Sequence, residues 1–244
     1  MRVWTYGEAN AKVKADLDLT NETFLTPDET VGLWNDAIQR AAAHIYKLGC
    51  EDEYFTKQAP LYLVTGQKRY SLPSDIYAQK IRGIIYQKGD QIYTVYRCRR
   101  RTKFVKMAEI DQLAQDIFYQ YDLENPSIAT GYQLVLTPNS RETDPAGQPS
   151  LTVHYIREVL YIPLVTAGSQ GATDLTKIDL PEFMTYIFAD VKAAVAAKIP
   201  HPNLQDFENN RDRELKLMID TLTEQVSDDA TEVEPDMSHY WRST

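Results

Sequence analysis

The sequence predicts an α+β protein whose helices come from both ends of the chain and enclose a β-rich middle. Apolar residues recur every three or four positions in the first 58 residues and again after residue 172, as in amphipathic helices. Between these parts, short runs rich in Val, Ile and Tyr alternate with turn residues, as in strands. We expect a helical bundle from 1–58 and 172–226, an inserted β-rich hairpin domain at 59–171, and an extended C-terminal tail at 227–244.

Two N-terminal helices are predicted from their start signals. "TYGE" at 5–8 and "TPDE" at 26–29 each place a Thr three residues before a Glu, which is the capping-box pattern. Pro27 suits the first turn of a helix. Apolar residues then follow one face as far as Leu48, and Gly49 suits a left-handed helix end. These signals predict a short helix after Thr5 and a long one after Thr26.

The middle of the chain changes to a strand pattern. We expect a hairpin within 60–73 that turns near Gly66, and a second within 80–99 that turns at "KGD". A helix is predicted from about 108 to 121. Strands are predicted at 132–138 and 150–162, joined by the loop "NSRETDPAGQPS", whose composition is typical of a projecting tip.

The last third returns to the helical pattern. The stretch "AGSQGATD" at 167–174 is typical of a flexible joint. A helix is then predicted over 180–199, where its apolar stripe is wide enough for a packed bundle. "PHPN" breaks it, and a last helix is predicted from about 204 to 226.

The composition argues against several classes of protein. Of the 244 residues only Cys50 and Cys98 are cysteines, which predicts a reduced intracellular chain without a disulfide framework or zinc site. Neither a signal peptide nor a stretch of transmembrane length is evident. The four histidines lack metal-ligand spacing, and no nucleotide-binding or nucleophile motif is present. We therefore expect no enzyme activity, cofactor or metal. An enzyme acting on the cell envelope stays a distant alternative without a candidate residue.

One basic run stands out in a chain of net charge −9. "RCRRRTKFVK" at 97–106 places six cations in ten residues, and these are Arg97, Arg99, Arg100, Arg101, Lys103 and Lys106. The run suits docking on an acidic protein surface, where guanidinium groups meet carboxylates. It equally suits a solvated strand end whose charge prevents stray pairing. Contact with nucleic acid is a third, less favoured interpretation.

The ordered segments resemble the head-to-tail adaptor, or connector, proteins of tailed bacteriophages, especially the short-tailed (podovirus) type. The resemblance is carried by six stretches, and it extends over nearly the whole chain to about residue 226. They are "WTYGEANAKVKADLDL" with "LTPDETVGLWNDAIQRAAAHIYKLG", "YFTKQAPLYLVTGQKRYSLPSD", "YQLVLTPN", "SLTVHYIRE" and "DLPEFMTYIFADVKAAVAAK".

The resemblance implies a structural virion protein that is made in the host cytoplasm and does not enter a membrane. Such adaptors assemble as a ring, usually of twelve copies, beneath the portal protein. The ring carries the DNA channel toward the tail nozzle and tail fibres, and DNA passes through without sequence-specific binding. In the family, a C-terminal extension commonly reaches along the portal.

The final segment fits such an extension. "SDDATEVEPD" carries five carboxylates and is typical of a solvated spacer, while "MSHYWRST" places two large aromatic rings almost at the last residue. Large, nearly rigid side chains make good interface anchors. We predict that the tail binds the portal through Met237, Tyr240, Trp241 and Arg242. A solvated terminus with chance aromatics is the plainer alternative.

Overall fold

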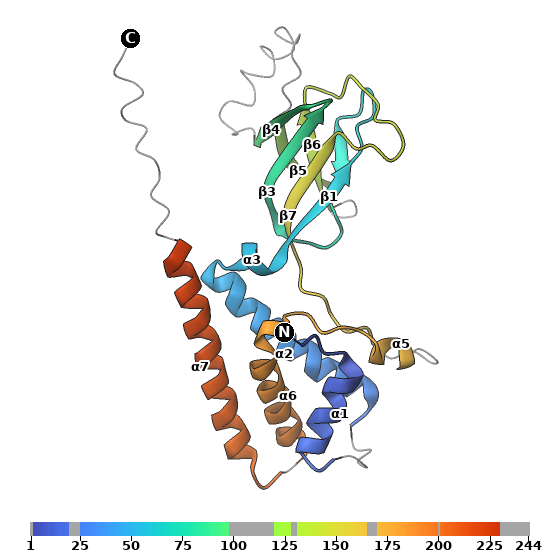
Figure 1. The fold of residues 1–244 in the computed structure, drawn as a ribbon. Helices are drawn as coiled ribbons and strands as arrows, with labels where there is room; N and C mark the ends of the chain where they lie inside the picture. Colours follow the sequence, from blue (N-terminus) through green and yellow to red (C-terminus); the bar gives the residue numbers. More distant parts are fainter. Residues whose placement is uncertain are drawn as a thin grey trace, which may run out of the picture. The chain divides into compact units, whose positions relative to one another are not determined.

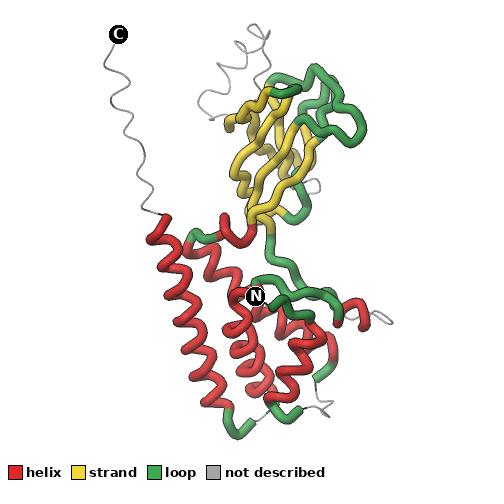
Figure 2. The backbone as a smooth tube through the Cα atoms, viewed as in Figure 1, coloured by secondary structure: helices red, strands yellow, loops and turns green. Residues whose placement is uncertain are grey.

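The computed structural model describes residues 2–19, 25–97, 120–127, 131–164, 170–199 and 201–229 (Figures 1 and 2). It confirms the mixed α+β class, with several helices and a curled seven-stranded sheet. The chain forms two compact units. Met1–Tyr54 and Val159–Thr244 make a helical unit, and Phe55–Glu158 makes a sheet unit.

The described elements have the following bounds. The helices are α1 (Tyr6–Asp16), α2 (Pro27–Leu48), α3 (Glu51–Phe55), α5 (Gln170–Asp174), the 3₁₀ turn η1 (Pro181–Phe183), α6 (Met184–Lys198) and α7 (Leu204–Asp229). The strands are β1 (Thr56–Leu61), β2 (Arg69–Ser71), β3 (Ile76–Lys88), β4 (Gln91–Arg97), β5 (Gln120–Ser127), β6 (Gly131–Thr137) and β7 (Leu151–Arg157).

Both predicted helix starts are confirmed. In α1 and in α2 the Thr side chain accepts the backbone N–H of the Glu three residues on, and that Glu accepts the N–H of the Thr. These reciprocal bonds satisfy two of the donors that a helix start leaves without intrahelical partners. Gly49 ends α2 at a φ of +82°, a conformation that favours glycine.

The core of the helical unit joins the two ends of the chain. Trp34 of α2 is fully buried and meets Phe188 of α6 edge-on, with ring centroids 5.6 Å apart. Tyr6 of α1 and Trp4 extend the contact, the first against Trp34 and the second against Phe188. Edge-to-face aromatic pairs contribute about 0.5–1.5 kcal/mol beyond the burial of their surface. Helices α1, α2 and α7 all pack against α6, which is therefore the central helix.

Two C-terminal predictions need correction. The last helix, predicted from about 204 to 226, forms as α7 but continues to Asp229, three residues into the predicted tail. Of its apolar side chains, Met218 and Leu222 are buried, whereas Leu217 and Val226 are exposed. The predicted joint at 167–174 is wrong for its last five residues, which form the short helix α5. Residues 167–169 lie outside the described part of the chain.

The sheet has the strand order β1-β7-β3-β4-β5-β6-β2. Neighbours are antiparallel except β4 and β5, which run parallel. The predicted hairpin at "KGD" is confirmed, since β3 pairs with β4 and Gly89 turns the chain at a φ of +59°. One face of the sheet carries a continuous core that includes Ile84, Tyr86, Leu134, Leu151 and Tyr155.

The hairpin predicted within 60–73 is wrong. The chain does turn at Gly66, but β1 pairs with β7 whereas β2 pairs with β6. The intervening loop bonds instead to residues after β6, for example from the Gly66 N–H to the Ser140 carbonyl at 2.7 Å. Partners distant in sequence therefore replace the local pairing.

Two further boundaries in the sheet unit differ from expectation. The helix predicted to end at Tyr121 is wrong there, because Tyr121 lies in β5 with its side chain in the core. Its first twelve residues lie outside the described part. The strand predicted over 150–162 ends at Arg157, where the chain leaves the sheet.

Two glycines in the helical unit provide a matched test of packing. A Cβ at Gly7 would lie 3.0 Å from Asp174 Cβ and 3.1 Å from its carbonyl oxygen, whereas one at Gly32 would meet nothing within 4 Å. Alanine in a helix is otherwise favoured by about 0.5–1 kcal/mol. We expect Gly32→Ala to raise the free energy of unfolding by about that amount, and Gly7→Ala to give no gain or a loss. Urea unfolding of both variants measures this, and an equal gain in both would contradict the close α1–α5 contact.

Candidate interaction surfaces

The predicted site residues fall mostly outside the described part of the chain. The four tail residues Met237, Tyr240, Trp241 and Arg242 lie there, as do Arg99, Arg100, Arg101, Lys103 and Lys106 of the basic run. Arg97 is described, and it is the exposed last residue of β4, in register with Tyr121 of β5. The described residues therefore do not test the predicted portal-binding tail or the predicted basic patch, and both stay predictions.

A surface that the sequence did not indicate lies on the helical unit. We call residues 159–164 the strap, because two hydrogen bonds fix this extended segment across α2. Asn35 Nδ2 donates to the carbonyl of Ile162 at 2.9 Å, and Asn35 Oδ1 accepts the Ile162 N–H at 2.8 Å. Val159 and Ile162 consequently point inward and are buried, while Leu160, Tyr161 and Leu164 are exposed.

Two further segments continue from the strap. The carboxylate of Asp179 accepts the Leu160 N–H at 3.0 Å, which links the strap to the stretch after α5. That stretch pairs in turn with the N-terminal segment, through Tyr6 N–H to Thr176 carbonyl and Ile178 N–H to Trp4 carbonyl. Val3 and Leu175 are exposed on these segments. We call the exposed side chains of the three linked segments the apolar edge, which comprises Val3, Leu160, Tyr161, Leu164 and Leu175.

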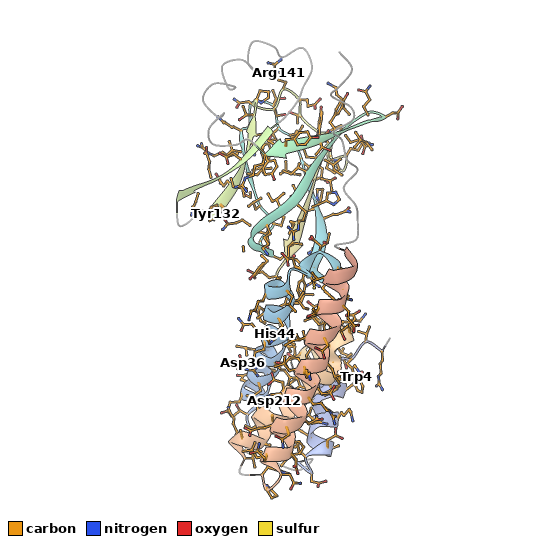
Figure 3. The ribbon with its side chains drawn as sticks, turned by 90° about the vertical axis from the view of Figure 1, so that its left-hand side faces the viewer. Trp4, Asp36, His44, Tyr132, Arg141 and Asp212 are labelled. Carbon is orange, nitrogen blue, oxygen red and sulfur yellow. The ribbon has the colours of Figure 1, made fainter. Side chains whose placement is uncertain are left out.

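Charged groups of the helical unit tie its helices together. Arg40 of α2 pairs with the buried Asp190 of α6 at 2.7 Å. Burial, and next the Asp190 carboxylate, raise the pKa of Tyr186 nearby. The Arg40–Asp190 ion pair thus joins α2 to α6 within the helical unit. Side chains on the outer surfaces of α2 and α7, such as Asp36 and Asp212 in Figure 3, are exposed.

The α1–α6 contact adds a second ionic connection. Lys192 of α6 donates to Asp16 of α1 at 2.5 Å and holds the pKa of that carboxyl below its ordinary value, and Lys12 adds to the effect. Because the pKa is lowered by folding, these bonds stabilise the unit at neutral pH. The stabilisation is lost as the pH falls through the lowered pKa.

The sheet unit presents a well-ordered tip made of two loops, 62–68 and 138–150. The Asp144 carboxylate accepts the N–H groups of Leu63 at 2.7 Å and Ser150 at 2.9 Å. The Thr65 N–H donates to the Thr143 hydroxyl at 2.9 Å. The loop expected to project is thus bonded to its neighbour through residues 140–144. Leu63 is buried while Tyr62 and Val64 stay exposed, so the tip offers a pre-ordered contact surface.

Two features, a metal-binding cluster and a membrane-spanning helix, have no candidate among the described residues. Within them, no group of three or more His, Cys, Asp or Glu is placed to hold a metal ion. None of the helices in the described ranges is both long and apolar enough to cross a membrane. What these ranges do offer is surface for contacts with other proteins.

A helical unit with an exposed apolar edge and a sheet unit with a pre-ordered tip are features of a component that joins other proteins. The family model described as SU10 adaptor protein matches residues 4–235, and the chain therefore belongs to that family. The resemblance to phage head-to-tail adaptors is thereby confirmed, and the protein is a bacteriophage adaptor, a structural component of the virion. A search of curated proteins gave no match.

One side chain, Asn35, bonds the strap to α2, which makes the contribution of that contact to stability measurable. Asn35→Ala removes both hydrogen bonds to Ile162 and leaves partly buried backbone groups without them. We expect a loss of about 1–3 kcal/mol in the free energy of unfolding, together with faster hydrogen exchange at the Ile162 amide. Asp36→Ala, at the exposed neighbouring position, serves as the control and should change stability by no more than about 0.5 kcal/mol. Unchanged hydrogen exchange at the Ile162 amide in Asn35→Ala would contradict the role of Asn35 in holding the strap.

Proposed function

We propose that this adaptor forms a ring beneath the portal, extends the DNA channel, and provides the platform on which the tail nozzle and fibres attach. The family match over residues 4–235 carries the proposal, because it spans both compact units and most of the spacer that follows α7. In this proposal the helical bundle is the ring core, the sheet unit is its insertion, and the C-terminal tail docks on the portal.

The charge of the chain suits a channel wall. Each copy carries −9, so twelve copies together carry −108. Such a wall repels the phosphate backbone and lets DNA slide, whereas a basic wall would retain it. DNA accordingly passes through the ring without sequence-specific binding.

The tail is long enough to reach another subunit. The predicted tail is 227–244, of which 227–229 end α7; the fifteen residues that follow span about 50 Å when extended. Ordering them costs on the order of 1–2 kcal/mol per residue, so specific anchors are needed to offset the cost. Tyr240 and Trp241 supply large aromatic surfaces near the tip, and Arg242 can pair with a carboxylate of the portal. Repetition around a ring then converts modest contacts into a durable joint.

We further propose that the role is purely structural, without catalysis. The ionisable side chains Asp16, Arg40 and Asp190 are engaged in ion pairs that hold helices together. A working acid or base needs instead a pocket in which it faces a substrate.

Removing the tail tests the docking role. We expect deletion of 227–244 to weaken binding to isolated portal rings at least about tenfold, because a loss of 1.4 kcal/mol suffices for that factor. The double variant Tyr240→Ala with Trp241→Ala should reproduce most of the loss. A full-length chain with the order of residues 227–236 shuffled serves as the control, since it keeps the spacer's length and charge. Sedimentation with portal rings measures the binding, and undiminished binding after deletion would exclude the tail from the mechanism.

The basic run favours a second candidate, a packaging accessory protein that binds nucleic acid. Six cations in ten residues are a typical phosphate-contacting pattern. This candidate predicts DNA affinity that falls steeply with salt and is lost when Arg99, Arg100 and Arg101 become Ala, while the corresponding Lys variants retain it. Fluorescence anisotropy with duplex DNA measures the affinity. An adaptor that acts as we propose shows no such affinity even at low salt.

A further inference from the structure

We infer that neighbouring copies of this chain contact each other through the apolar edge of one copy and the outer face of α7 of the next. The inference rests on the proposed ring and names the surfaces that close it. A ring requires a heterologous contact, in which two different faces on opposite sides of each subunit meet. The helical unit offers one suitable pair of faces.

The first observation is where this unit exposes large apolar side chains. In its described residues they comprise the five members of the apolar edge together with Leu217 and Val226 of α7. The edge is joined to α1 through α5 and the N-terminal segment, whereas α7 packs on α6 and α2. Figure 1 accordingly shows α5 and α7 at opposite sides of the helical unit. The apolar edge and Leu217 therefore lie on the two sides that a ring needs, while Val226 follows Met218 and Leu222 on the other face of α7.

The second observation is the exposed face of α7. Leu217, Asp220, Thr221 and Glu224 are all exposed, and their spacing of three, four and seven residues places them on one helix face. Leu217 is 54% exposed, with the exposed Arg213 one turn before it and Asp220 one turn after it on the same face. The opposite face, with Met218 and Leu222, holds α7 to its own unit. The one large apolar side chain of this outward face, Leu217, can insert between the exposed leucines of the apolar edge of the next copy.

The third observation is charge. After Lys216, α7 contains no cation to its end at Asp229, so the outer face of its second half is acidic. The opposite side of the unit carries the exposed Lys177 beside the apolar edge.

Lys177 is the cation of this side that we expect to face the next copy, because Arg2 pairs with Glu8 at 3.5 Å. The Asp179 carboxylate is in turn engaged by the Leu160 N–H. Copies of net charge −9 repel each other in most orientations. When the side of one copy that carries Lys177 faces the carboxylates of α7 on the next copy, the repulsion between the copies falls and the register of the contact is fixed.

The fourth observation is preorganisation. Asn35 and Asp179 hold the strap backbone, so Leu160 and Tyr161 are presented without further ordering of the chain. Because ordering costs subtract directly from affinity, a fixed edge binds more strongly than a free segment of the same composition.

The test is the pattern in which portal rings fill with adaptor. Contact between neighbours makes filling cooperative, so native mass spectrometry of wild-type adaptor with limiting portal should show rings that are either empty or full. We expect Leu160→Asp and Asp220→Lys to bind portal singly and fill rings at random, with the coupling between neighbours at least about tenfold weaker. Asp36→Lys on α2, an equal charge reversal on another exposed helix face, should fill rings as wild type does.

A charge exchange separates contact from misfolding. Lys177→Asp alone should lower cooperativity, and Lys177→Asp combined with Asp220→Lys should restore it, because the opposed pair is re-formed with its signs reversed. Cooperative filling by Leu160→Asp and Asp220→Lys would overturn the inference while the proposed ring stands. Wild-type adaptor that fails to bind portal at all would overturn the proposed function, and the inference with it.

Discussion

Burial of Trp34 is the constraint on which the helical unit depends. The residue comes from the N-terminal part of the chain, and its main ring partner, Phe188, comes from the C-terminal part. Tyr6 and Trp4 close the cluster from α1 and the segment before it. The contact therefore holds together two stretches that the whole sheet unit separates in sequence. Neither stretch can bury its apolar face alone, so each needs the other to fold.

The exposed surfaces of the helical unit depend on this contact between Trp34 and Phe188. Once α2 and α6 are joined through Trp34, Asn35 on the next position of α2 is fixed where it can hold Ile162. The strap then has one row of side chains inward and one outward, and α5 with the N-terminal segment continues the exposed row. Helix α7 packs along α6 and also touches α2, and its opposite face is exposed. The family membership gives these surfaces their setting, an adaptor that joins components of the virion.

Features encoded within a few residues were predictable from the sequence. The capping boxes at Thr5 and Thr26, the glycine end of α2 and the turn at Gly89 each depend on neighbours in the chain. The pairing of the strands around 60–73 was not predictable from neighbouring residues, because β1 finds its partner 90 to 100 residues away in β7. The strap was also missed, since its defining bonds join Asn35 to Ile162 across 127 positions. An exposed Leu-Tyr pair after a strand was the only local signal, and it resembles a strand end.

The chain enters and leaves the sheet unit at neighbouring positions. Thr56 and Ile156 are direct partners in the β1–β7 ladder, so the insertion begins and ends on two adjacent strands. Opposed residues of such a ladder lie about 5 Å apart. A few residues could therefore join Tyr54 to Val159 without pulling on α2 or the strap. The sheet unit is thus one continuous segment, Phe55–Glu158, whose two ends lie on neighbouring strands, so its length can change without altering the core of the helical unit.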